Sequence, residues 1–251
     1  MNGLEALAVV AAGMGAGAIN AIVGSGTLLS FPTLLAVGFP SVTANVSNNI
    51  GLIPGSMAGV WGFRRELKGQ GRRARTLAAC SASGALVGAI LLLTLPSSVF
   101  DAVIPVLVLL AAFLMATSPW LSRFVAGRRV DGARDVGVLP MIITFFAGIY
   151  GGYFGAAQGI ILLAMLAVFV PDDLRRSNAL KNLLAGTVNA VAGVFFVIFA
   201  DVSWDAVALI AAGATVGGLL GARIARWIDP NVLRIVVVIY AVAIAIRLIL
   251  T

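Results

Sequence analysis

Long apolar runs, separated by short gaps rich in Gly, Pro and charged residues, divide the chain into ten segments. The first five segments cover residues 4–23, 27–38, 42–62, 75–95 and 99–121. The second five cover residues 136–154, 159–170, 175–200, 204–223 and 231–250. Eight of these runs have about 20 residues, the length that a helix needs to cross a hydrocarbon layer of about 30 Å. The pattern predicts an all-α protein that crosses a membrane several times.

The second segment of each series, 27–38 and 159–170, is too short to cross that layer, because it has only about 12 residues. We interpret each short segment as one arm of a broken or re-entrant hairpin with the segment before it, so that the hairpins cover 4–38 and 136–170. Backbone groups released at such a break have no hydrogen-bond partner in lipid. Both hairpin turns are therefore expected to face protein or a water-filled cavity.

The two series resemble copies of one five-segment unit. An offset of 133 residues, without a gap, places Gly15 on Gly148, Gly26 on Gly159, Asn45 on Asn178, Asn49 on Asn182, Gly84 on Gly217 and Gly88 on Gly221. Glycine pairs arise easily in so glycine-rich a chain, but the paired asparagines are harder to attribute to chance. We therefore expect a first repeat at 1–118, a linker at 119–133 and a second repeat at 134–251.

Composition and charge refine this prediction. With 61% hydrophobic and 11% charged residues, the chain is much less charged than a soluble domain, in which about 25% of residues are charged. The net charge of +7 does not indicate a nucleic-acid partner, because the basic residues occupy the gaps between apolar runs. Such residues favour the cytoplasmic side of a membrane.

The basic residues also predict the orientation of the repeats. If each broken hairpin returns to the side it left, sixteen of the seventeen Lys and Arg residues share the cytoplasmic face, and only Arg247 lies outside. Both termini are then outside and the linker is cytoplasmic, so the two repeats have opposite orientations. An inverted repeat of this kind is common in secondary transporters.

Residues suited to catalysis or metal binding are scarce. The chain has no histidine, which removes the usual general base and the commonest metal ligand. Cys80 is the only cysteine, so neither an intramolecular disulfide nor a Cys-x-x-Cys motif exists. Carboxylates such as Glu5, Asp101 and Asp205 lie near segment ends, which leaves a buried proton relay without an obvious carrier. We expect no enzyme activity, no cofactor and no metal.

The first candidate binding residues lie at the two hairpin turns. A helix that begins after the break directs its N-terminal amides and its dipole inward, and both favour an anion. The residues concerned are Ser25, Gly26 and Thr27 in the first hairpin, and Gln158 and Gly159 in the second. The alternative is that these turns are only flexible connections at the membrane surface.

The second group lies on the long segment after each hairpin. Asn45, Asn49 and Ser56 have the same spacing as Asn178, Asn182 and Asn189, so each trio occupies one helix face. The candidate substrate-binding residues on these faces are Asn45, Asn49, Asn178, Lys181 and Asn182. The asparagines could instead hydrogen-bond only to neighbouring helices. Lys181, whose counterpart is the neutral Asn48, could instead extend to the membrane interface.

Several of these runs resemble the sulfite exporter TauE/SafE family, also called the TSUP permeases. They are IVGSGTLLSFP at 22–32, ANVSNN at 44–49, PGS at 54–56, YGGYFG at 150–155 and SNALKN at 177–182. The resemblance covers essentially the whole chain. It implies a multi-pass bacterial inner-membrane carrier for small sulfur-containing or organic anions, such as sulfite, thiosulfate or sulfonates. Family members differ in substrate and in the direction of transport.

We therefore predict a secondary transporter that binds a small anion between the two hairpins and exports it by alternating access. An inside-negative potential favours anion exit by about 2.3 kcal/mol per charge per 100 mV, so export needs no coupling ion. The expected partners are the lipid bilayer and a small anionic substrate, without nucleic acid, and a homo-oligomer is compatible with the sequence. The alternatives are a membrane-embedded enzyme, a non-transporting assembly subunit or an anion channel.

Overall fold

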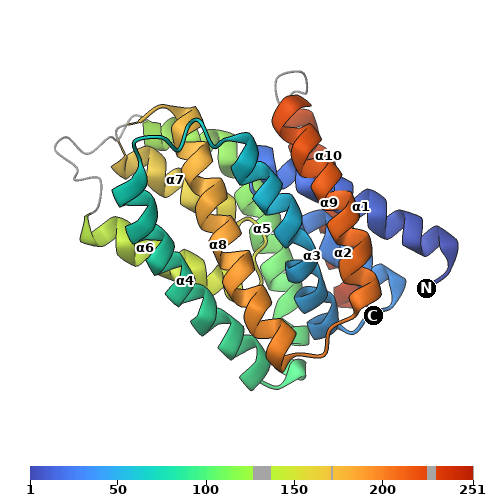
Figure 1. Ribbon diagram of the computed structural model, residues 1–251. Helices are drawn as coiled ribbons and strands as arrows, with labels where there is room; N and C mark the ends of the chain where they lie inside the picture. The colour runs from blue at the N-terminus through green and yellow to red at the C-terminus, as the bar shows by residue number, and fades with distance from the viewer. Residues whose placement is uncertain (127–136, 171, 225–229, 251) are drawn as a thin grey trace.

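The computed structural model describes residues 1–126, 137–170, 172–224 and 230–250. The secondary structure in these ranges is entirely helical, which confirms the predicted all-α class (Figure 1). The helices are α1 (Gly3–Ile22), α2 (Thr27–Val37), α3 (Ser41–Gly62), α4 (Gly71–Thr94), α5 (Ser97–Ala126), α6 (Val138–Tyr153), α7 (Gln158–Phe169), α8 (Leu174–Phe199), α9 (Trp204–Ile224) and α10 (Pro230–Leu250).

Helix bounds agree closely with the apolar pattern, including the short α2 and α7 of 11 and 12 residues. Two bounds differ. Helix α4 begins at Gly71 rather than residue 75, because its basic first turn lies outside the apolar pattern but still makes helical contacts. Helix α5 continues to Ala126, through the first eight residues of the predicted linker. The rest of that linker, 127–133, lies outside the described residues.

Several helices are suited to crossing a membrane by length and composition. Within the described ranges, five qualify: Gly3–Ile22, Gly71–Thr94, Ser97–Trp120, Arg175–Phe199 and Trp204–Gly221. Large apolar side chains are exposed on the outer helices, among them Phe113, Phe146, Phe199 and Ile239. Lipid chains are a suitable environment for such a surface, whereas water is not. The chain is therefore a multi-pass membrane protein.

The helix packing relates the two halves of the chain. Helix α1 packs along α9, and α4 packs along α6. The 133-residue offset exchanges α1 with α6 and α4 with α9, so these two pairs are counterparts. The same holds for α3 against α9 and α8 against α4. This pairing is what two copies related by a two-fold axis would produce, and it supports the predicted repeat.

Glycines bring these counterpart helix pairs into backbone contact. Gly217 of α9 lies against the carbonyl of Met14, and Gly84 of α4 lies against the carbonyl of Phe145. A Cβ at Gly148 would lie 2.6 Å from the carbonyl oxygen of Ser81, closer than van der Waals contact allows. Small residues of this kind let membrane helices approach closely. Gly59 is different, since its nearest neighbour is a methyl group 4.0 Å away.

Candidate functional site

The turns of the two broken hairpins touch each other inside the protein. Gly24 has φ +86°, and its counterpart Ala157 has φ +62°, so both breaks use a left-handed residue. The Gly159 amide donates to the Gly24 carbonyl over 3.1 Å. A Cβ at Gly24 would lie only 2.7 Å from the Gly159 Cα atom, so the two backbones are in direct contact. The hairpin turns are therefore a junction between the repeats.

The counterpart asparagines Asn45 and Asn178 stabilise the broken helix ends. The last carbonyls of a helix have no partner within the helix and must find one elsewhere. Asn45 Nδ2 donates to the carbonyl of Tyr153, the last residue of α6, over 2.9 Å. Asn178 Nδ2 donates to the carbonyl of Ala21, near the end of α1, over 3.3 Å. The side-chain amides of Asn45 and Asn178 therefore donate to neighbouring helices, as the alternative without a ligand contact predicted.

Asn20 holds the first hairpin turn from both sides, although the sequence interpretation did not include it. Its Oδ1 accepts a hydrogen bond of 2.7 Å from the Gly26 amide, which opens α2. Its backbone carbonyl accepts a bond of 3.1 Å from Lys181 Nζ. The sequence feature that could have identified Asn20 is its position in the otherwise apolar end of α1, where a side-chain amide needs hydrogen-bond partners.

A cavity of about 30 Å³ lies beside this junction. A water molecule needs about 10–15 Å³ on this measure, so the space suits two or three waters, comparable with a small oxyanion. Of the predicted site residues, Thr27, Gln158, Gly159 and Asn182 line it. The other lining residues are Asn20, Ala21, Gly24, Gly55, Ser56, Gly59, Gly155, Ala185 and Asn189.

The cavity wall carries neutral polar groups. Gln158 is 2% exposed, and its Nε2 has no hydrogen-bond partner among the described residues. Asn189 Nδ2 donates to Ser56 Oγ over 3.1 Å, and these two residues are themselves counterparts in the repeat. The lining residues include no carboxylate. The wall therefore offers hydrogen-bond donors without a negative charge that would repel an anion.

Six predicted site residues are not on the cavity wall. Asn45, Asn178 and Lys181 bind helix-end carbonyls, and Gly26 packs against the backbone of Ala16. Ser25 and Asn49 are buried nearby, and their side-chain oxygens have no hydrogen-bond partner among the described residues. Four of the ten predicted site residues therefore line the cavity, and these six do not.

Lys181 is completely buried, with 0% of its surface exposed. The alternative in which it reaches the membrane interface is therefore wrong. Its stem passes behind the first hairpin turn, because a Cβ at Gly24 would lie 3.4 Å from Lys181 Cδ. Asn20, which accepts the hydrogen bond from Lys181, lines the cavity and separates the lysine from it.

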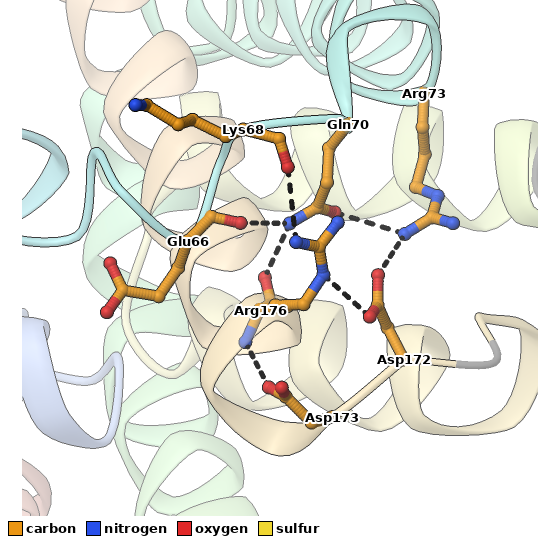
Figure 2. A network of polar contacts seen from close by, with 7 residues as sticks. All are labelled: Glu66, Lys68, Gln70, Arg73, Asp172, Asp173 and Arg176. Atoms are coloured by element: carbon orange, nitrogen blue, oxygen red, sulfur yellow. Dashed lines mark hydrogen bonds and ion pairs between the residues drawn. The ribbon is translucent and has the colours of Figure 1, made fainter.

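A network of charged and polar groups joins the two repeats at one end of the bundle (Figure 2). Asp172, just before α8, binds Arg73 of α4 at 3.0 Å and Arg176 of α8 at 2.6 Å. Burial alone would raise the pKa of the Asp172 carboxyl, but hydrogen bonds and positive charge from Arg176 and Arg73 outweigh it and lower that pKa. The aspartate is thus held ionised between two cations.

Gln70 completes this Asp172 network. Its Oε1 accepts from Arg73 at 3.0 Å, and its Nε2 donates to the Arg176 carbonyl at 3.2 Å. Arg176 also donates to the carbonyl of Lys68 over 3.1 Å. The α3–α4 connection of one repeat is thereby tied to the start of α8 in the other.

The chain is similar over nearly its full length to known membrane proteins. Residues 9–248 match the model of the family described as sulfite exporter TauE/SafE. The chain is 26% identical over 237 residues to the probable membrane transporter protein ORF9 of Sinorhizobium sp, a match covering 93% of this chain and 88% of the relative. It is 24% identical over 238 residues to a probable membrane transporter protein of Haemophilus influenzae, covering 94% and 92%.

A third relative, the probable membrane transporter protein YfcA of Escherichia coli strain K12, is 26% identical over 236 residues, covering 93% of this chain and 85% of the relative. The names of these three relatives describe transporters rather than enzymes. With a family match from residue 9 to residue 248 on an all-helical, multi-pass fold, the protein belongs to the sulfite exporter TauE/SafE family and is a membrane transporter.

Proposed function

We propose that the protein carries a small sulfur-containing or organic anion, of the sulfite, thiosulfate or sulfonate class, across the bacterial inner membrane. The anion binds in the cavity beside the hairpin junction. The observation that carries this proposal concerns Gln158, which lines the cavity and whose buried Nε2 has no hydrogen-bond partner among the described residues. A buried donor of this kind is costly unless a ligand or water accepts its hydrogen bond.

Side chains rather than the helix amides are the proposed anion contacts. The Gly26 and Gly159 backbone amides already donate hydrogen bonds within the protein. The prediction that these two helix-start amides bind the anion is therefore wrong. Gln158 and Thr27 offer donors from the two opposed hairpins. Asn182 of α8 donates to the Ala21 carbonyl over 3.5 Å, and the second proton of its Nδ2 is a further donor. Lys181 adds an amine behind Asn20, which attracts an anion when it is protonated.

We propose alternating access as the mechanism, because three of the residues that line this cavity on one side of the junction have apolar, buried counterparts in the other half of the chain. The counterparts of Thr27, Gly55 and Ala185 are Ile160, Val188 and Leu52, all apolar and buried. Exchanging the conformations of the two repeats would close the present cavity and open an equivalent space on the opposite side.

The position of the cavity favours access from the cytoplasm in this conformation, which is compatible with the predicted export. Gly55 and Gly59 are in the C-terminal half of α3, and Asn182 is in the first half of α8. These helix ends lead to the basic connections that form the Asp172 network. Basic connections are expected on the cytoplasmic side.

The proposal is tested with purified protein and a panel of sulfite, thiosulfate and methanesulfonate. We expect at least one anion to raise the melting temperature. In Gln158→Leu, the affinity should fall about tenfold or more, because a hydrogen bond to a charged group contributes about 1.5–3 kcal/mol. Ser81→Ala is the matched control, since it removes a buried hydroxyl of α4 that also lacks a partner among the described residues.

Two results would contradict the proposal: no thermal response to any anion, or an unchanged response in Gln158→Leu. Proteoliposomes distinguish a carrier from a channel. Saturable flux with accelerated exchange by anion on the opposite side indicates a carrier, and non-saturating flux indicates a channel.

A further inference from the structure

We propose that transport is coupled to protons through Lys181, whose amine binds one proton together with each anion and releases it with that anion. This inference rests on the proposed anion function and deepens it. The sequence alone suggested export without a coupling ion, because it showed no mid-segment carboxylate to carry a proton. A lysine amine serves the same purpose.

The position of Lys181 connects it to the binding cavity. Among the residues that the structure describes, its Nζ has one hydrogen bond, of 3.1 Å, to the backbone carbonyl of Asn20. Asn20 lines the cavity, and its side chain holds the amide that opens α2. The amine is therefore linked directly to the cavity wall, and the adjacent residue Asn182 lines the same cavity.

No carboxylate lies at the depth of Lys181 on the helices that pack against α8, which are α1, α3, α4, α6 and α7 among the described contacts. Helices α3 and α7 have no titratable residue. The titratable groups of the others are Glu5 in the first turn of α1, Arg72, Arg73, Arg75 and Cys80 on α4, and Tyr150 and Tyr153 on α6. On the α8 side, Asp172 is bound to Arg73 and Arg176 at the helix start.

An ammonium group buried without a full counter-charge is costly in free energy, because it has lost its hydration. The helix-end carbonyl of Asn20 supplies only a partial negative charge. An anion in the cavity supplies a full negative charge, separated from Lys181 by Asn20. Binding of the anion and binding of the proton to Nζ therefore favour each other, and this coupling is reciprocal.

The transport cycle follows from this linkage. On the side where the cavity is open, the anion enters and Nζ takes one proton, forming one N–H bond. On the other side, the anion leaves and that N–H bond breaks. A singly charged anion then crosses without net charge, so the anion and pH gradients, rather than the membrane potential, set the direction. The first repeat has the neutral Asn48 at the counterpart position, so each cycle carries one proton.

Calorimetric titration of methanesulfonate into the purified protein tests this proposal. Methanesulfonate keeps a single charge from about pH 6 to about pH 9, so a change in bound protons belongs to the protein. Titrations in buffers of different ionisation enthalpy measure that change. Within this pH range we expect uptake approaching one proton per anion in the wild type, none in Lys181→Met, and unchanged uptake in the control Asn48→Ala.

The outcomes separate this inference from the proposed function. Anion binding without proton uptake anywhere in the pH range overturns the inference and leaves the anion function standing. Failure of methanesulfonate, thiosulfate and sulfite to bind overturns both. If Lys181→Met does not fold, the number of protons taken up per anion by the wild type still shows whether binding is coupled to protons. Lys181→Gln, whose side chain is closer to lysine in polarity, then tests whether Lys181 is the group that takes up the proton. In liposomes, wild-type methanesulfonate flux should respond to a pH gradient and not to an imposed potential.

Discussion

At the scale of single residues, the hairpin junction depends on the absence of side chains. Gly24 and Gly159 come so close that each would place a Cβ against the other's backbone. The Cβ of an alanine at Gly159 would lie 2.6 Å from the Gly24 Cα atom. Backbone atoms cannot rotate away as a flexible side chain can, so the two hairpins would have to separate.

We therefore predict that Gly159→Ala destabilises the protein by about 1–3 kcal/mol, the usual cost of overpacking. A thermal or denaturant unfolding experiment in detergent measures the effect. Gly71→Ala is the control, because a Cβ there meets nothing within 4 Å, and its stability should change by less than about 0.5 kcal/mol. Equal stability of the two variants would contradict the proposed contact.

Asn45 permits a second prediction at this scale. Removing its amide leaves the Tyr153 carbonyl without that partner at the end of α6. Asn45→Ala should destabilise the protein by about 1–3 kcal/mol, the cost of an unpaired buried polar group. Because Asn45 does not line the cavity, anion affinity should change much less than in Gln158→Leu. A selective loss of anion binding with unchanged unfolding would show that Asn45 contacts the ligand instead.

At the scale of elements, the Asp172 network joins the α3–α4 connection to α8 with full charges. The 133-residue counterparts of Gln70, Arg73, Asp172 and Arg176 at the opposite end are uncharged. Gln70 corresponds to Ser203, whose amide donates to Ser47 Oγ over 3.0 Å, and Asp172 corresponds to Phe39. One end of the repeat interface is therefore held by ion pairs, and the counterpart contacts at the other end are neutral.

This network makes a pH prediction. The pKa of Asp172 is lowered in the folded protein, so its ion pairs stabilise the fold above the pKa of the unfolded chain, about 4. That contribution is lost as the pH falls through the lower, folded value. Melting temperatures measured from about pH 7 to about pH 3 should show this loss in the wild type and a smaller one in Asp172→Asn.

At neutral pH, Asp172→Asn should cost about 1–2 kcal/mol, between the values for exposed and buried ion pairs. Asp201→Asn, which alters an exposed aspartate, is the control and should behave like the wild type. A pH dependence of stability that is identical in Asp172→Asn and the wild type would show that other carboxyls are responsible.

At the scale of the whole molecule, the predicted repeat is consistent with the contact between the two hairpins. Helix pairs related by the 133-residue offset pack in the same way, yet several of the residues that line the described cavity differ from their counterparts. Ala185 lines it, whereas its counterpart Leu52 is buried. The proposed alternation between two orientations should exchange the accessibility of these two positions.

Single cysteines at these positions test this exchange in a Cys80→Ser background. A membrane-impermeant thiol reagent should label Ala185→Cys from the cytoplasmic side. Leu52→Cys should be labelled from the opposite side, and more slowly, because it becomes accessible only in the alternate state. Labelling of Ala185→Cys only from outside would reverse the predicted orientation. Labelling of both positions from the same side would contradict alternating access.

The sequence by itself determined the helices, the two short hairpin arms and the paired asparagines. These features depend on the local length and polarity of the chain, which hydrophobic patterning reports directly. A predicted helix bound was wrong where charged rather than apolar residues form the helix, as in the first turn of α4. Arg73 in that turn is bound by Asp172, 99 residues away.

Only the tertiary structure decided which polar groups face the cavity. Asn45 and Asn182 occupy the same stripe pattern and both donate to helix-end carbonyls, those of Tyr153 and Ala21, yet Asn182 also lines the cavity and Asn45 does not. Lys181 could have extended to the interface, and its burial depends on Asn20, 161 residues earlier in the chain. Burial and hydrogen-bond partners arise from such long-range contacts, which a local pattern does not contain. Periodicity therefore determined the helices, and through-space packing determined the site.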